Sequence, residues 1–133
     1  GLLTTQKDDT NCYTILSLLY SHLNFNQELH KDHLHPASYF NKLKPKDCPI
    51  EEDYNFYKDP KNWNSIANLQ LLNSSLNESK LDTPLEQWVK ERNIDIDNQL
   101  IPRDVSLNIK DFHNFIEVRK ELLKKKFKDI TGQ

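Results

Sequence analysis

Three histidines and one aspartate lie within the stretch HKDHLHP, which covers residues 30–36. Histidine is the side chain that titrates near neutral pH, and its neutral imidazole can accept a proton or bind a metal ion. The aspartate adds an oxygen ligand of the kind that divalent cations prefer. These residue types at this spacing favour general-base or metal-assisted chemistry, whereas an isolated histidine would more often be an ordinary surface or core residue.

A second polar group lies in ANLQLLNSSLNESK, which covers residues 67–80. Asn77 and Lys80 are three residues apart there, a spacing that puts both side chains on one face of a helix. For Asn68 a role in a turn is nearly as well supported as a role in a site. For Asn77 helix capping is the competing interpretation. Only the two groups together, in this order, indicate a functional site.

The hydrophobic pattern predicts the elements that position both groups. A strand over residues 27–33 should end in a turn, because Pro36 keeps the residue before it out of the helical region. A second strand is expected over residues 65–73. It should be followed by a helix whose N-cap is Ser74 or Ser75.

The rest of the chain is predicted from its prolines and from apolar residues at helical spacing. Residues 44–63 hold three prolines and mixed charge, which predicts a long loop between the strands. Helices are expected over residues 11–23, 83–93 and 108–130. The second of these should begin with Thr83 as N-cap, Pro84 at the first helical position and Glu86 in a capping box. Gly132 follows the last helix, in a position where glycine commonly ends one.

Three blocks of the sequence, DHLHP, NLQLL and NESK, resemble in this order the HNH nuclease motif on a ββα-metal fold. More narrowly, DHLHPASYF with WNSIANLQLLNSSLNESK is similar to the C-terminal nuclease domain of GmrSD-type restriction proteins. The resemblance covers residues 30–81. It implies an α+β fold in which a short two-stranded ribbon and its helix pack against additional helices, with a mostly helical chain. The motif core would be residues 27–82 and a C-terminal helical part residues 83–131, within one domain over residues 1–133.

The resemblance also implies a role for each polar residue. His33 would be the general base of phosphodiester hydrolysis. Asp32 and Asn77 would hold one divalent cation, Mg²⁺ or Mn²⁺, with oxygen ligands. Asn68 corresponds to the middle asparagine of the catalytic set, which ties the loop to the histidine-bearing strand and is not itself a ligand. Lys80 would contact the substrate phosphate.

His35 departs from the commonest form of the motif, in which an apolar residue stands at this position. Three roles stay open for it: a partner of a ligand, an additional metal ligand or a phosphate contact. Asp32 and His33 are adjacent, so in a regular strand their side chains would face opposite sides. We expect the turn at Pro36 to let both serve one site.

Composition and charge limit the class of protein. The length of 133 residues suits one domain with its own core. The net charge of -2 indicates no partner by itself, but Lys120, Lys124 and Lys128 share one helix side and could contact a DNA backbone. Cys12 and Cys48 are far apart, which argues against a structural zinc site. No stretch has the ~20 apolar residues of a membrane span and no signal peptide is evident, so we expect a cytoplasmic protein without a membrane partner.

These observations predict a metal-dependent HNH endonuclease domain that acts on DNA, as the nuclease part of a restriction or phage-defence protein. The chain contains no methionine, so we expect it to come from a longer protein. The resemblance to GmrSD-type proteins implies an upstream nucleotide-hydrolysing domain in that protein. The alternative is a catalytically silent nucleic-acid-binding or scaffolding module on the same ββα core.

Overall fold

The structure is a computed structural model that describes residues 1–132. Its two strands, β1 (Leu29–His33) and β2 (Leu69–Asn73), form an antiparallel ribbon. The described α-helices are α1 (Cys12–Leu19), α2 (Ala37–Lys42), α3 (Tyr54–Lys58), α4 (Pro60–Trp63), α5 (Ser74–Lys80), α6 (Leu85–Glu91) and α7 (Phe112–Thr131). Short 3-10 turns cover Leu2–Thr4, Pro45–Asp47, Glu51–Asp53, Ile66–Asn68 and Ile109–Asp111. The expected α+β class, with a two-stranded ribbon among helices, is confirmed.

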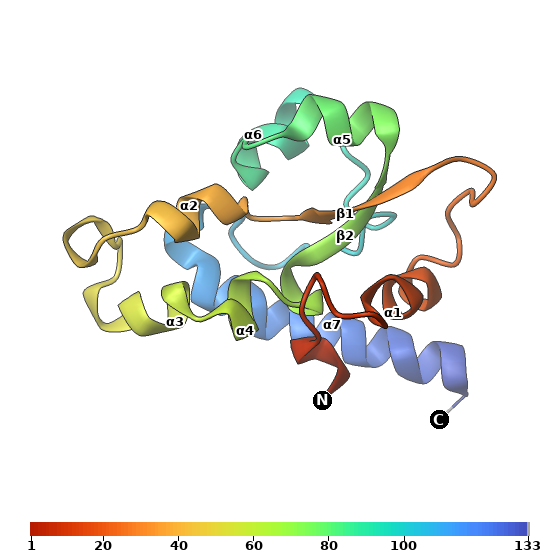
Figure 1. Cartoon of the computed structure of the whole chain (residues 1–133), viewed down its shortest axis with the longest axis horizontal. Helices are drawn as coiled ribbons and strands as arrows, with labels where there is room; N and C mark the ends of the chain where they lie inside the picture. Colours follow the sequence, from red (N-terminus) through yellow and green to blue (C-terminus); the bar gives the residue numbers. More distant parts are fainter. Residues whose placement is uncertain (133) are drawn as a thin grey trace.

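The ribbon lies in the middle of the molecule, with helices on both of its sides (Figure 1). On one side α5 packs against both strands, with α6 next in the chain. On the other side α1 and the long helix α7 pack against each other and under the ribbon. Within residues 1–132, no helix combines the length and apolar character that a membrane crossing would need.

The two faces of the ribbon belong to different hydrophobic clusters. Residues of a strand alternate between faces, and Leu69 and Leu71 of β2 join a cluster with residues of α1 and Leu123 of α7. Leu72 points to the other face, into a cluster that contains Trp88 and the aromatic residues at the start of α7. Gln70 shares the face of Leu72 and is fully buried. Gln70 is therefore a buried polar side chain between apolar neighbours.

The order of strands and helix along the chain around the site agrees with the expectation, but the bounds of these elements differ in detail. β1 begins at Leu29 and ends at His33, inside the predicted range of residues 27–33. The second predicted strand, residues 65–73, begins with a 3-10 turn and becomes β2 at its end. The predicted N-cap of α5 at Ser74 or Ser75 is wrong. Asn73 has this role, because its side chain accepts a hydrogen bond from the backbone N–H of the third helical residue.

The predicted capping box of α6 is also wrong. The helix begins at Leu85 with Pro84 as its N-cap, and no side chain caps it. The backbone N–H of Thr83 is instead bonded to the carbonyl of Lys80 at 2.9 Å. Thr83 therefore belongs to the turn that leaves α5.

The predicted loop over residues 44–63 contains α3, α4 and two 3-10 turns. Pro60 stands at the first position of α4, where a missing N–H costs nothing. Asp59 caps this helix by accepting from the backbone N–H of Lys61 at 3.0 Å. Tyr57 of α3 is fully buried, so packing against the core stabilises helices that are too short to be stable alone. Pro45 begins a 3-10 turn and Pro60 begins α4, so prolines in this segment do not exclude helices.

The long C-terminal helix is confirmed. α7 follows a 3-10 turn and ends at Thr131, one residue beyond the predicted range of residues 108–130. Gly132 ends it in the left-handed conformation, with φ 73°, and its N–H bonds to the carbonyl of Lys128 at 2.9 Å.

Candidate functional site

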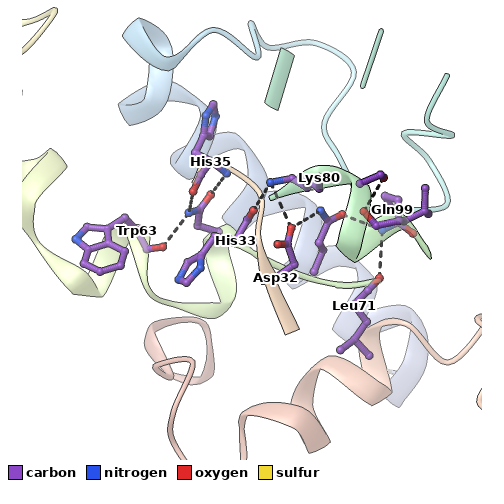
Figure 2. Close-up of polar contacts among 11 residues, drawn as sticks. Asp32, His33, His35, Trp63, Leu71, Lys80 and Gln99 are labelled. Carbon is purple, nitrogen blue, oxygen red and sulfur yellow. Dashed lines mark hydrogen bonds and ion pairs between the residues drawn. The ribbon is translucent and has the colours of Figure 1, made fainter. Parts of the chain in front are cut away.

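Asp32 lies near the end of β1, opposite Gln70 of β2 and beneath the end of α5 (Figure 2). Its Oδ2 accepts a hydrogen bond from Nε2 of Gln70 at 3.1 Å and pairs with Nζ of Lys80 at 3.3 Å. The side chain is 15% exposed. Both contacts use Oδ2, so within residues 1–132 the second oxygen, Oδ1, keeps its lone pairs for another partner.

Lys80 holds the carboxylate of Asp32 from inside the molecule. Its side chain is fully buried, and Nζ also donates to the backbone carbonyl of His33 at 2.7 Å. The ammonium lies 5.5 Å from the ring centroid of Trp88, a distance suited to a cation–π contact. Burial lowers the pKa of Lys80, and the neighbouring Asp32 opposes that shift. The expected phosphate contact of Lys80 stays a prediction, since its observed contacts are all internal.

His33 is held at the opposite side of the strand from Asp32. Its Nε2 lies 2.8 Å from Oδ1 of Asn64, and its ring is 5.8 Å from that of Trp63. Burial lowers the pKa of His33, while the bond to Asn64 and the charge of Asp32 act in the other direction. The imidazole is therefore neutral at physiological pH and able to accept a proton.

Asp32 and His33 thus have different neighbours, as adjacent residues of a strand do. Within the described chain, no hydrogen bond joins the carboxylate of Asp32 to the ring of His33. Lys80 is the residue that links them, because it contacts the side chain of one and the backbone of the other. The turn at Pro36 leaves this alternation intact.

Asn68 is fully buried and connects the segment before β2 to the segment after β1. Its Oδ1 accepts from the backbone N–H of His35 at 3.0 Å. Its Nδ2 donates to the carbonyls of His35, at 2.9 Å, and of Trp63, at 2.8 Å. All three bonds go to backbone groups, so this side chain fixes the path of the two chain segments at this end of the ribbon.

The side chain of His35 is enclosed in the aromatic core. Its ring meets those of Phe112 and Phe115 edge-on, at centroid distances of 5.4 and 4.7 Å. Only 1% of the residue is exposed, and within residues 1–132 its Nε2 has no hydrogen-bond partner. Burial, with a smaller effect of the nearby Lys80 charge, lowers the pKa of His35 to about 3. A ring so enclosed does not reach a phosphate or a metal ion, so His35 supports the site through its backbone bonds to Asn68.

Asn77 lies on the side of α5 that faces β1. Ser74 and Lys80, three residues to either side of it, both contact that strand: Oγ of Ser74 lies 3.0 Å from Nε2 of His30, and Lys80 bonds to Asp32. Residues at i, i+3 and i+6 share one helix face, so Asn77 lies between these two contacts. Its side chain is half-buried. Because Asn73 caps the helix, the competing interpretation of Asn77 as the cap is excluded.

The donors expected for a metal ion are one carboxylate and one amide oxygen, from Asp32 and Asn77. Within residues 1–132, no group of three or more His, Cys, Asp or Glu side chains is placed to hold a metal ion. Few protein ligands, all of them oxygen, suit Mg²⁺, which keeps several waters and shares substrate oxygens. The free Oδ1 of Asp32 fits this chemistry, although the ammonium of Lys80 reduces the attraction of the carboxylate for a cation.

Four residues that the sequence did not single out complete the surroundings of the site. Asn64 lies beside His33, Gln6 contacts Asn64, and Gln70 lies beside Asp32. Nε2 of Gln99 donates to Oε1 of Gln70 at 2.8 Å and so orients the amide that holds Asp32. Gln70 was detectable as a polar residue inside an apolar run, but Gln6 and Gln99 are distant in the chain and carry no such signal.

A scan against protein-family models found none that matches the chain, and a search of curated proteins also found no match. The functional assignment therefore depends on the residues and on their geometry.

Proposed function

We propose that this chain is a metal-dependent HNH endonuclease domain that hydrolyses phosphodiester bonds in DNA, with β1, β2 and α5 as its ββα-metal core. The observation that carries the proposal is the placement of the three sequence blocks. The DHLHP segment and the NLQLL segment pair as neighbouring strands, and the helix with NESK packs back on the first of them. These contacts support the proposal, because they bring His33, Asn68, Asp32 and the helix that carries Asn77 to the same ribbon.

His33 takes a proton from the attacking water in this proposal. Its lowered pKa keeps the imidazole unprotonated at neutral pH, so it is available as a base. Asp32 stays oriented because Gln70 and Lys80 both hold its Oδ2. A Mg²⁺ ion bound by Asp32 and Asn77 would supply Lewis-acid stabilisation of the phosphate and of the leaving oxygen.

The surroundings of His33 also provide positive charge for a phosphodiester. The charge of Lys7 is close enough to lower the pKa of His33, and Lys7 is half-buried. Nζ of Lys31 donates to the backbone carbonyl of Lys7 at 2.6 Å, which holds the N-terminal segment against β1. A phosphate beside His33 would meet this charge.

The wider part of the proposal concerns the protein to which this domain belongs. We place it in a restriction or phage-defence protein whose upstream nucleotide-hydrolysing domain selects the DNA. Its support is the resemblance of the motif blocks to the nuclease domain of GmrSD-type proteins, and a pull-down of DNA by the longer protein would test it.

Nicking of a supercoiled plasmid with and without Mg²⁺ tests the nuclease itself. His33→Ala should lower the single-turnover rate by about 10²- to 10⁴-fold, the usual cost of losing a general base. His22→Ala is the matched control, because His22 is exposed, lies outside the candidate site and forms its hydrogen bond with the carbonyl of Asn98, at 2.8 Å. Equal rates for the parent and His33→Ala, with both folded by circular dichroism, would exclude His33 as the base.

A catalytically silent nucleic-acid-binding module is the second candidate. The observation that favours it is the buried ammonium of Lys80 beside Asp32, because this charge competes with a metal ion for the carboxylate. DNA binding by the parent protein without any Mg²⁺-dependent nicking would support this candidate over the enzyme.

A further inference from the structure

The side chain of Gln6 has only one orientation that satisfies its contacts. Its Nε2 lies 3.2 Å from the carbonyl oxygen of Thr4 and 3.0 Å from that of Pro60. Carbonyl oxygens only accept hydrogen bonds, so the group facing them must be the NH₂. Oε1 of Gln6 is therefore turned the other way, toward Asn64.

The orientation of Gln6 determines that of Asn64. Oε1 of Gln6 can only accept, and the Asn64 amide group that lies 3.2 Å from it must be Nδ2. Oδ1 of Asn64 then faces His33, 2.8 Å from its Nε2. An amide oxygen also only accepts, so Nε2 of His33 must carry a hydrogen. In a neutral imidazole the other nitrogen, Nδ1, is then an acceptor.

The backbone holds these three side chains in place. The N–H of Lys7 bonds to the carbonyl of Asn64 at 2.9 Å, and the N–H of Ile66 bonds to the carbonyl of Thr5 at 3.0 Å. Gln6 and Ser65 form an isolated β-bridge between the same two segments. Asn64 and Gln6 are therefore held in a fixed position relative to each other. Trp63 packs beside the ring of His33.

We infer that Asn64, itself oriented by Gln6, is a positioning residue that fixes His33 in the tautomer with hydrogen on Nε2 and thereby makes Nδ1 the basic atom. Within residues 1–132, no other side-chain hydrogen bond engages the ring of His33, so Nδ1 can accept a proton from water. The tautomer follows from the contacts alone, whereas its use as a base rests on the proposed nuclease function. The N-terminal segment thus belongs to the functional site.

Two-bond ¹H–¹⁵N correlation spectra of histidine-labelled protein at neutral pH test the tautomer without any measurement of activity. In the parent, His33 should show the pattern of hydrogen on Nε2. Asn64→Leu removes the acceptor and should give an average of both tautomers. Asn64→Asp retains an oxygen acceptor and should keep hydrogen on Nε2 of His33, while its negative charge raises the pKa of the ring. Gln6→Met frees the amide of Asn64 to turn and should also give a mixed pattern.

Asn55→Leu is the matched control for these variants, because Asn55 is exposed on α3 and its side chain takes no part in the hydrogen-bonded chain of Gln6, Asn64 and His33. It should leave the His33 signals unchanged. Hydrogen on Nδ1 of His33 in the parent, or an unchanged tautomer in Asn64→Leu, would overturn the inference.

Single-turnover nicking of a plasmid separates this inference from the proposed function. Asn64→Leu should slow nicking by about 10- to 100-fold, the usual cost of losing a group that orients an active residue. Asn64→Asp should recover much of the parent rate once the pH exceeds the raised pKa of His33, which a merely structural role would not predict. If the tautomer depends on Asn64 but the parent cuts no nucleic acid, the inference that Asn64 fixes the tautomer is supported and the nuclease proposal fails. If the parent cuts and Asn64→Leu cuts equally well, Asn64 has no positioning role in catalysis.

Discussion

A neutral imidazole enclosed by phenylalanine rings resists protonation, and His35 is in this state. Its pKa of about 3 results chiefly from burial, with a contribution from the Lys80 charge. The unfolded chain has no such constraint, and its histidines titrate near 6.5. Below that pH His35 binds a proton in the unfolded state but not in the folded state. The free energy of unfolding must therefore fall as the pH decreases from about 6.5 toward 3.

Replacing His35 by a residue that does not titrate should remove this part of the acid destabilisation. The His35 contribution to the loss of stability between pH 7 and pH 5 should be about 2 kcal/mol, at ~1.4 kcal/mol per pH unit. His35→Phe should show a smaller loss over that interval, whatever its stability at pH 7. Urea denaturation at both pH values measures the difference. The exposed His22 provides the control His22→Gln, and a parent-like loss in His35→Phe would contradict the enclosed neutral state.

Single residues also show what the sequence could reveal of the site. Asp32, His33 and Asn68 were predicted as site residues because their residue types match the order of a known motif. The identity of their partners was not accessible, because Gln6 and Asn64 are 58 residues apart and meet only through folding. The internal position of Lys80 was also missed, since an exposed and a buried lysine look the same in a sequence. Whether a lysine can contact a phosphate or orients a carboxylate depends on its contacts in the folded protein.

Helices and strands were predictable where a periodic apolar pattern is long. α7 was found because its apolar face persists over its full length, and β1 because Pro36 marks the turn after it. α3 and α4 were missed because each is too short for a period to show. Their stability comes from tertiary contacts such as those of the buried Tyr57.

The lysines of α7 provide a test of whether this helix contacts the DNA backbone. Lys120, Lys124 and Lys128 line a groove of about 700 Å³ between α7 and the N-terminal residues. Lys124 forms an exposed ion pair with Glu121 at 3.2 Å, which counterions can replace. If the three side chains contact phosphates, each should contribute about -0.9 to the slope of log affinity against log salt.

Replacing all three lysines by glutamine should therefore make that slope less steep by up to about 2.7. Fluorescence anisotropy with a short duplex from low to moderate salt measures it. The matched control replaces three exposed lysines at the end of α2 and just after it, Lys42, Lys44 and Lys46. An equal slope in the parent and the α7 variant would mean that this face is only solvated surface.

One buried arginine joins the parts of the molecule that surround the site. Arg119 of α7 is fully buried, and its guanidinium donates to the carbonyls of Leu100, Ile66 and Ala67 at 3.0, 2.9 and 3.1 Å. It also donates to the hydroxyl of Tyr20 at 2.9 Å. That hydroxyl in turn donates to the carbonyl of Gln99 at 2.7 Å. Through these bonds α7 holds both the turn that carries Asn68 and the network that reaches Asp32.

Removal of Arg119 should therefore destabilise the whole fold and disturb the site with it. Arg119→Met should lower the free energy of unfolding by about 3 kcal/mol or more, because each buried acceptor left unpaired costs about 1–3 kcal/mol. Arg119→Lys should recover only part of this loss, since an ammonium cannot match the planar fork that reaches several acceptors. Urea denaturation compares both variants with the parent.

Arg103→Met is the control for that comparison. Arg103 is exposed and pairs with Asp97 at 2.6 Å, and exposed ion pairs contribute little to stability. The side-chain amide signals of Asn68 in ¹H–¹⁵N spectra report on the site, because Ile66 and Ala67, which Arg119 holds, directly precede this residue. The chemical shifts of these signals should change in Arg119→Lys and stay the same in Arg103→Met. If both variants leave them unchanged, the site is independent of α7, and the network is a feature of stability alone.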